Sequence, residues 1–123
     1  KVSLLGNVAV DMNAPELTGT GKGELWAYFP GQSSTKVARL NKATGASDQE
    51  WRLPGLGGSV AAWAFAHWGG RYYIFVTVSG LIKNTNKVLL FDPALGTAPT
   101  ILDNTPYMIV GAGVSTCAPV ILG

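Results

Sequence analysis

One stretch of this chain occurs twice, as KVARLNKATG at residues 36–45 and as KVLLFDPALG at residues 87–96. Upstream of each copy lies an aromatic stretch, GELWAYF at residues 23–29 and GRYYIFV at residues 70–76. The elements follow one another in the same order in both copies, and the second Lys-Val stretch begins 51 residues after the first. A constant order at a spacing of about 50 residues indicates a repeated structural unit.

The repeated stretches have the character of strands, because they are rich in β-branched and aromatic residues. No window shows a sustained helical period, and 16 Gly and 7 Pro interrupt the sequence at intervals that suit turns. Both Lys-Val stretches end in a turn that opens with Asn41 or Asp92 and closes with Gly45 or Gly96. We expect strands at residues 2–5, 8–10, 24–29, 36–40, 50–53, 60–66, 71–78, 87–91, 100–102 and 108–110.

Each unit is predicted to be four antiparallel strands: an inner strand rich in small residues, the aromatic strand, the Lys-Val strand and a short outer strand near Trp51 or Ile101. Small residues suit the crowded innermost strand of a propeller blade. We therefore predict an all-β, β-propeller-like fold of two four-stranded antiparallel blades plus flanking partial strands, with a β-sandwich as the alternative. The units span approximately residues 14–56 and 60–105, with partial units at 1–10 and 108–117, in a single domain of residues 1–123.

The aromatic stretch followed by the Lys-Val stretch and its Gly-terminated turn resembles the blade repeats of secreted bacterial β-propeller proteins. More narrowly, residues 16–29, 63–70 and 110–119 resemble the C-terminal part of extracellular proteins of unassigned role from myxobacteria and their relatives. The resemblance implies a secreted, extracellular or cell-surface bacterial protein. Its motifs mark a structural unit and no chemistry, and propellers include enzymes, lectins and scaffolds.

Composition narrows the classes of partner. The net charge is +2 and the nine Lys and Arg residues are scattered, which argues against nucleic acid. No apolar run reaches the roughly 18 residues of a membrane span.

Because the chain begins at Lys1, we expect a processed product or a piece of a longer chain. Two blades do not close a ring of about four to eight, so we expect apolar blade faces to be covered by other copies, by the rest of the propeller or by another chain.

We therefore predict a non-enzymatic binding and assembly module that forms a homo-oligomer or joins the remainder of a propeller. A carbohydrate-binding, lectin-like propeller that uses rim aromatics is the alternative, and a hydrolase completed by missing blades is a weaker one. No cofactor or metal is expected, since the only histidine has no ligand partner at metal-binding spacing.

Four residues near strand ends are candidates for ligand contact: Trp51, Trp63, His67 and Trp68. An exposed ring there could stack on a sugar, although for His67 a structural role is the simpler interpretation. The single cysteine, Cys117, is either a buried small hydrophobic residue or half of a disulfide with another segment or chain.

Three other motifs are better explained without a ligand. Asp11, Asn13 and Glu16 lack the carboxylate density and the glycine of a calcium loop. The stretch GTGKG at residues 19–23 lacks the spacing of a phosphate-binding loop and is predicted to be a hairpin turn. Among the carboxylates, no pair is singled out by spacing for glycoside hydrolysis.

Overall fold

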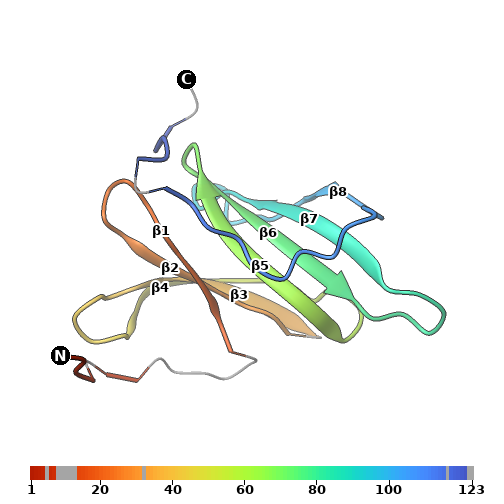
Figure 1. Cartoon of the computed structure of the whole chain (residues 1–123), viewed down its shortest axis with the longest axis horizontal. Helices are drawn as coiled ribbons and strands as arrows, with labels where there is room; N and C mark the ends of the chain where they lie inside the picture. The colour runs from red at the N-terminus through yellow and green to blue at the C-terminus, as the bar shows by residue number, and fades with distance from the viewer. Residues whose placement is uncertain (5, 8–13, 32, 116, 122–123) are drawn as a thin grey trace.

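The computed structural model describes residues 1–4, 6–7, 14–31, 33–115 and 117–121, and it contains strands and turns but no helix among them (Figure 1). The first sheet, sheet A, consists of β1 (Glu16–Gly19), β2 (Leu25–Phe29), β3 (Ser34–Leu40) and β4 (Ser47–Pro54). The second, sheet B, consists of β5 (Val60–Trp68), β6 (Arg71–Val78), β7 (Thr85–Phe91) and β8 (Thr100–Leu102). The prediction of an all-β chain with two four-stranded antiparallel units is confirmed.

Both sheets have the same simple topology. The strand orders are β1-β2-β3-β4 and β5-β6-β7-β8, and every neighbouring pair is antiparallel. The small-residue strand, the aromatic strand, the Lys-Val strand and the outer strand therefore follow one another as predicted in each copy.

The predicted turns also match between the copies. In the first, the Gly45 amide donates to the Asn41 carbonyl over 2.8 Å, and the Asn41 side chain accepts from Ala43 over 2.9 Å. In the second, Gly96 donates to the carbonyl of Asp92 over 2.8 Å, and the Asp92 carboxylate accepts from Ala94 over 2.9 Å. Both glycines have positive φ, which a residue with a Cβ adopts at a cost. The same side chain chemistry thus closes the same turn twice.

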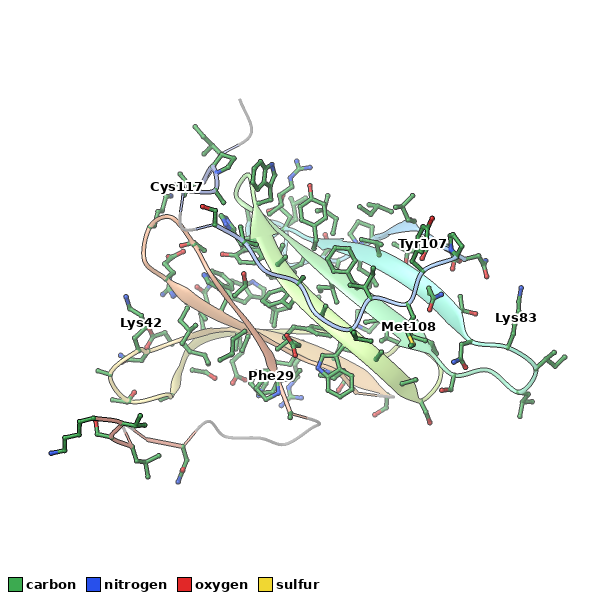
Figure 2. The ribbon with its side chains drawn as sticks, viewed as in Figure 1. Phe29, Lys42, Lys83, Tyr107, Met108 and Cys117 are labelled. Carbon is green, nitrogen blue, oxygen red and sulfur yellow. The ribbon has the colours of Figure 1, made fainter. Side chains whose placement is uncertain are left out.

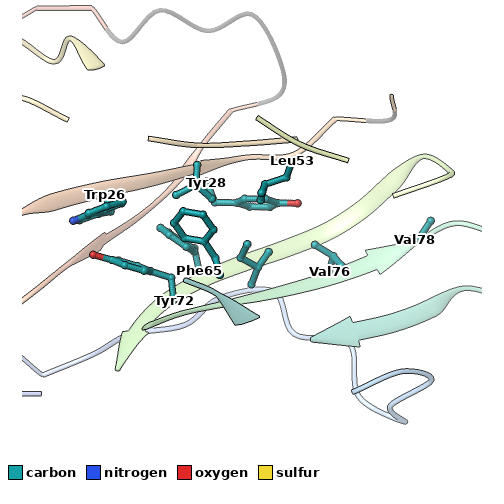
Figure 3. Packing of buried hydrophobic residues seen from close by; sticks show 10 residues of the cluster. Trp26, Tyr28, Leu53, Phe65, Tyr72, Val76 and Val78 are labelled. Carbon is teal, nitrogen blue, oxygen red and sulfur yellow. The ribbon is translucent and has the colours of Figure 1, made fainter. Parts of the chain in front are cut away.

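The core lies between the sheets, which pack face to face (Figure 3). Tyr28 of β2 lies against Phe65 of β5, with ring centroids 6.0 Å apart, and Phe65 stacks on Tyr72 of β6 at 5.6 Å. The two sheets approach each other most closely along β1 and β5, where the amide of His67 donates to Thr18 Oγ1 over 3.2 Å. Farther from these strands the gap is filled by larger rings, including Trp26 and Trp51.

The outer faces of the two sheets are apolar as well, but they are buried to different degrees. On sheet A, Ala27, Phe29 and Ala38 are fully buried. On sheet B, Tyr73 and Phe75 project away from the core, because they alternate with the buried Tyr72 and Ile74, and they are only partly buried. Sheet B therefore has the more accessible outer face.

The expected strands outside the two sheets are not formed among the described residues. Residues 2–4 and 108–110 have no strand structure, while residues 5 and 8–10 lie outside the described part of the chain. The C-terminal segment runs across sheet B (Figure 1) and is held at its two ends, where Thr105 donates to Asn86 over 3.0 Å and Gly69 donates to Pro119 over 2.8 Å. Without a partner strand alongside, alternation of small and apolar residues does not suffice to form a ladder.

Candidate functional site

A cleft of about 330 Å³ opens between the two sheets at one end of the molecule, and we call it the rim cleft. Its walls come from the β1–β2 turn, the start of β4, the β5–β6 turn and the β7–β8 turn, which antiparallel pairing brings to the same end. Its polar and aromatic lining includes Glu24, Arg39, Trp51, His67 and Tyr72. The cleft therefore exists only because both repeat units contribute to it.

Glu24 is the best-connected charged group in the rim cleft. Its Oε2 accepts hydrogen bonds from Trp26 Nε1 over 3.2 Å and from the Thr20 hydroxyl over 3.5 Å. Its Oε1 lies 3.8 Å from Arg39 Nη1. The β1–β2 hairpin holds the carboxylate in place, since the Glu24 amide also donates to Thr20 Oγ1 over 3.3 Å. Glu24 thus fixes the Arg39 guanidinium beside the cleft.

His67 also lines the rim cleft and is almost completely buried, with 2% of its surface exposed. Its ring centroid is 5.0 Å from that of Tyr72, and among the described residues its Nδ1 has no hydrogen-bond partner. Burial lowers the pKa of His67, the negative charge of Glu24 opposes the shift and the positive charge of Lys22 adds to it. The imidazole is therefore neutral near neutral pH.

The aromatic wall of the cleft is a set of rings from both sheets. Trp51 stacks on Trp26 with centroids 5.2 Å apart and meets Phe91 edge-on at 5.5 Å. A side chain at Gly96 would bring its Cβ within 3.3 Å of Trp51, so the β7–β8 turn fits closely against this ring. Tyr72 completes the wall. Burial, together with the nearby Glu24 charge, raises its pKa, and the phenol stays protonated.

Two of the four residues predicted from the sequence line the rim cleft and two do not. Trp51 of β4 and His67 of β5 both line it. Trp63 packs against the core instead, with its Nε1 buried and without a partner among the described residues. Trp68 is 50% exposed and lies on the other face of sheet B, because adjacent residues of a strand point to opposite sides.

Cys117 is exposed and free in the described part of the chain, so the buried alternative is wrong, while a disulfide with another segment or chain stays a prediction. The predicted hairpin at residues 19–23 is confirmed, since Gly23 donates to the Thr20 carbonyl over 2.9 Å and has positive φ. Asp11 and Asn13 lie outside the described residues.

Glu24, Arg39 and Tyr72 are not among the residues that the sequence predicts to contact a ligand. A signal for Glu24 was present, because it stands two residues before Trp26 and so falls on the same side of the strand. Arg39 likewise stands two residues after Val37 of β3 and falls on the same side of its strand, and Val37 is buried in the core. The sequence does not show how the two sheets face each other, and this arrangement is what brings these residues into the same cleft as His67.

The described residues contain no group of three His, Cys, Asp or Glu side chains arranged to hold a metal ion. In the same part of the chain, no helix has the length and hydrophobicity needed to span a bilayer. No family model matches the sequence, and neither a curated protein nor a solved structure is significantly similar to it.

The pKa of His67 predicts how stability depends on pH. Because the folded protein binds the His67 proton more weakly than the unfolded chain does, stability should decline as pH falls below about 6.5 until the lowered pKa is reached. Replacement His67→Gln should flatten this part of the curve. Denaturant unfolding between about pH 7.5 and about pH 5 measures the slope.

Glu50 is the control residue for this measurement. Its pKa is lowered, chiefly by a hydrogen bond with the Ser47 side chain, so its contribution is lost only below the ordinary value of 4.5. Glu50→Gln should leave the slope between about pH 6.5 and about pH 5 unchanged. Equal slopes in wild type and His67→Gln would show that the imidazole is not the group responsible.

Proposed function

We propose that this chain is a non-enzymatic binding and assembly module of the propeller type, acting outside the cell or at its surface, in which a second copy covers the exposed apolar side chains of the C-terminal segment and β8. The cellular location follows the resemblance to secreted bacterial blade repeats. The observation that carries the assembly proposal is the apolar surface left accessible on the sheet B side.

Three features support the propeller type over a sandwich. Each sheet is made of four consecutive strands, whereas sandwiches commonly pass the chain between sheets through Greek-key connections. The sheets meet most closely along their first strands, β1 and β5. The outer faces are apolar, as expected for blades that have a neighbour on each side.

The accessible surface lies along the C-terminal segment and the last strand. Tyr107, Met108 and Val110 are 72%, 56% and 68% exposed, and Figure 2 shows Tyr107 and Met108 projecting from the segment beyond β8. In β8, Ile101 and Leu102 are also exposed, and β8 is an edge strand without a charged residue. Exposed apolar side chains and an unprotected edge are typical of an interaction site.

A second copy is the occupant that this chain itself suggests. Within one molecule, the two copies of the repeat already bury aromatic faces against each other. By contrast, the outer edge strand of sheet A, β4, carries Asp48, Glu50 and Arg52, which discourage further pairing. Association is therefore expected on one side of the molecule, as in a closed symmetric dimer.

The test is a triple replacement, Tyr107→Ser with Met108→Ser and Val110→Ser, studied by sedimentation velocity. We expect the wild type to associate and the triple variant to weaken association at least about tenfold, because it removes apolar area from the interface. The control is Leu81→Ser with Ile82→Ser, two equally apolar residues that are fully exposed in the β6–β7 loop. Identical sedimentation of the wild type and the triple variant would refute the assembly surface.

A second candidate function is glycan binding, and the rim cleft is the observation that favours it. A half-buried tryptophan, a neutral histidine and charged groups surround a cavity whose volume lies in the range of small-molecule sites, roughly 300–1,000 Å³. A glycan array probed with the full chain tests this candidate, and an absence of binding above background contradicts it.

A further inference from the structure

The composition of the rim cleft points to a ligand with a negative charge, and we propose that it binds an acidic saccharide, one whose sugar carries a carboxylate. In this arrangement, Arg39 and Lys22 attract the carboxylate while the Trp51 ring receives the sugar face. The proposal rests on glycan binding at the same cleft and specifies the class of sugar.

The rim cleft is lined by more positively than negatively charged side chains. Among the described residues that line it, Lys22 and Arg39 are cationic, Glu24 is the one carboxylate, and His67 is neutral. Glu24 already interacts with Trp26, Thr20 and Arg39, so its negative charge is occupied within the protein. Lys22 is exposed at the hairpin tip and forms no ion pair in the part of the chain that the structure describes. Among the described residues, one positive charge is thus left without a counterion.

Arg39 is positioned to act on a ligand as well as on Glu24. One of its guanidinium nitrogens lies 3.8 Å from Glu24 Oε1, and 38% of its side chain surface is exposed. A guanidinium has five N–H donors, so the contact with Glu24 leaves donors for a second carboxylate. Held by Glu24, the guanidinium loses less conformational entropy when a ligand binds.

The remaining lining suits a sugar ring better than a small inorganic anion. Trp51, stacked on Trp26, contributes a half-buried indole to the lining. A phosphate or sulfate ion has no apolar surface to cover an indole, whereas a pyranose presents C–H groups on its faces. Gln49 and Thr20 add neutral hydrogen-bonding groups. His67 adds a neutral imidazole that is almost completely buried.

The test compares two disaccharides with the same skeleton, cellobiose and cellobiouronic acid, by titration calorimetry with the full chain. We expect the acidic disaccharide to bind about tenfold more tightly at low salt, and this preference to shrink as salt screens the exposed Lys22 charge. Replacement Lys22→Gln should reduce the affinity for the acidic disaccharide about fivefold and leave that for cellobiose unchanged. Lys83→Gln is the matched control, since Lys83 is exposed at the far end of the molecule (Figure 2).

The outcomes separate this proposal from glycan binding in general. If both disaccharides bind equally and Lys22→Gln changes neither affinity, the acidic preference is wrong and the sugar cleft stands. If inorganic phosphate competes as strongly as the acidic disaccharide while cellobiose does not bind, the cleft is a simple anion site and the saccharide proposal is wrong. If neither disaccharide nor any glycan on an array binds, the glycan-binding function itself fails.

Discussion

Replacing Phe65 with alanine is expected to lower the free energy of unfolding by about 3–5 kcal/mol, the usual cost of removing a buried phenylalanine. Phe65 is fully buried and belongs to sheet B, yet its ring contacts Tyr28 of sheet A as well as Tyr72 beside it (Figure 3). The loss should therefore destabilise both sheets together. Denaturant unfolding followed by tryptophan fluorescence and by circular dichroism measures it, and the two probes should give one coincident transition.

The control for Phe65→Ala is Leu81→Ala, because Leu81 is fully exposed in the β6–β7 loop. It should change stability by no more than about 0.5 kcal/mol. Two separate transitions in the wild type, or a loss below about 1 kcal/mol in Phe65→Ala, would mean that the sheets do not share one core.

Removing the Trp51 side chain is expected to have the largest effect on ligand binding. Trp51 is half-buried, lines the rim cleft and stacks on Trp26. If it receives a sugar face, Trp51→Ala should reduce glycan affinity at least about thirtyfold, equivalent to about 2 kcal/mol, as for an aromatic anchor at a binding site. Calorimetric titration with the saccharide that binds the wild type most tightly measures this loss.

Trp51→Ala also removes packing, so its controls must separate binding from stability. Trp51→Phe keeps an aromatic face and should retain most of the affinity. Trp68→Ala removes a tryptophan that is 50% exposed on the outer face of sheet B, away from the cleft, and should leave binding unchanged. Equal losses in Trp51→Ala and Trp68→Ala would exclude the cleft as the binding site.

The two sheets were predictable from the sequence because the strand and turn patterns that specify them lie in short stretches and occur twice. The Asn41 and Asp92 turns each end in a glycine with positive φ, and each is followed and preceded by strands of the expected character. These are properties of neighbouring residues, which a sequence displays directly.

The rim cleft was predictable only in part, since it depends on how the sheets face each other. Trp51 and His67 were recognised as residues near strand ends, but nothing in the sequence places them in the lining of one cavity. The sequence predicts Trp68 together with His67 because the two are adjacent in the chain. Successive residues of a strand point to opposite faces, so Trp68 does not line the cleft.

The strand predicted at residues 108–110 is not formed, for a related reason. Its pattern matches that of β5, but a strand needs a hydrogen-bonding neighbour, and β5 has one in β6 while the C-terminal segment has none among the described residues. The segment is fixed at Thr105 and Pro119, and the side chains of Tyr107, Met108 and Val110 are exposed between these points. This exposure is the basis of the assembly proposal.

Native mass spectrometry of the full chain tests the central claim most directly. An assembly module with an accessible apolar side should appear as ions at integer multiples of its 12.9 kDa mass, with the dimer predominant and the triple Ser variant shifted to the monomer. A wild-type chain that remains strictly monomeric at the same concentration, while unfolding in one cooperative transition, would contradict the account and favour a self-contained pair of sheets.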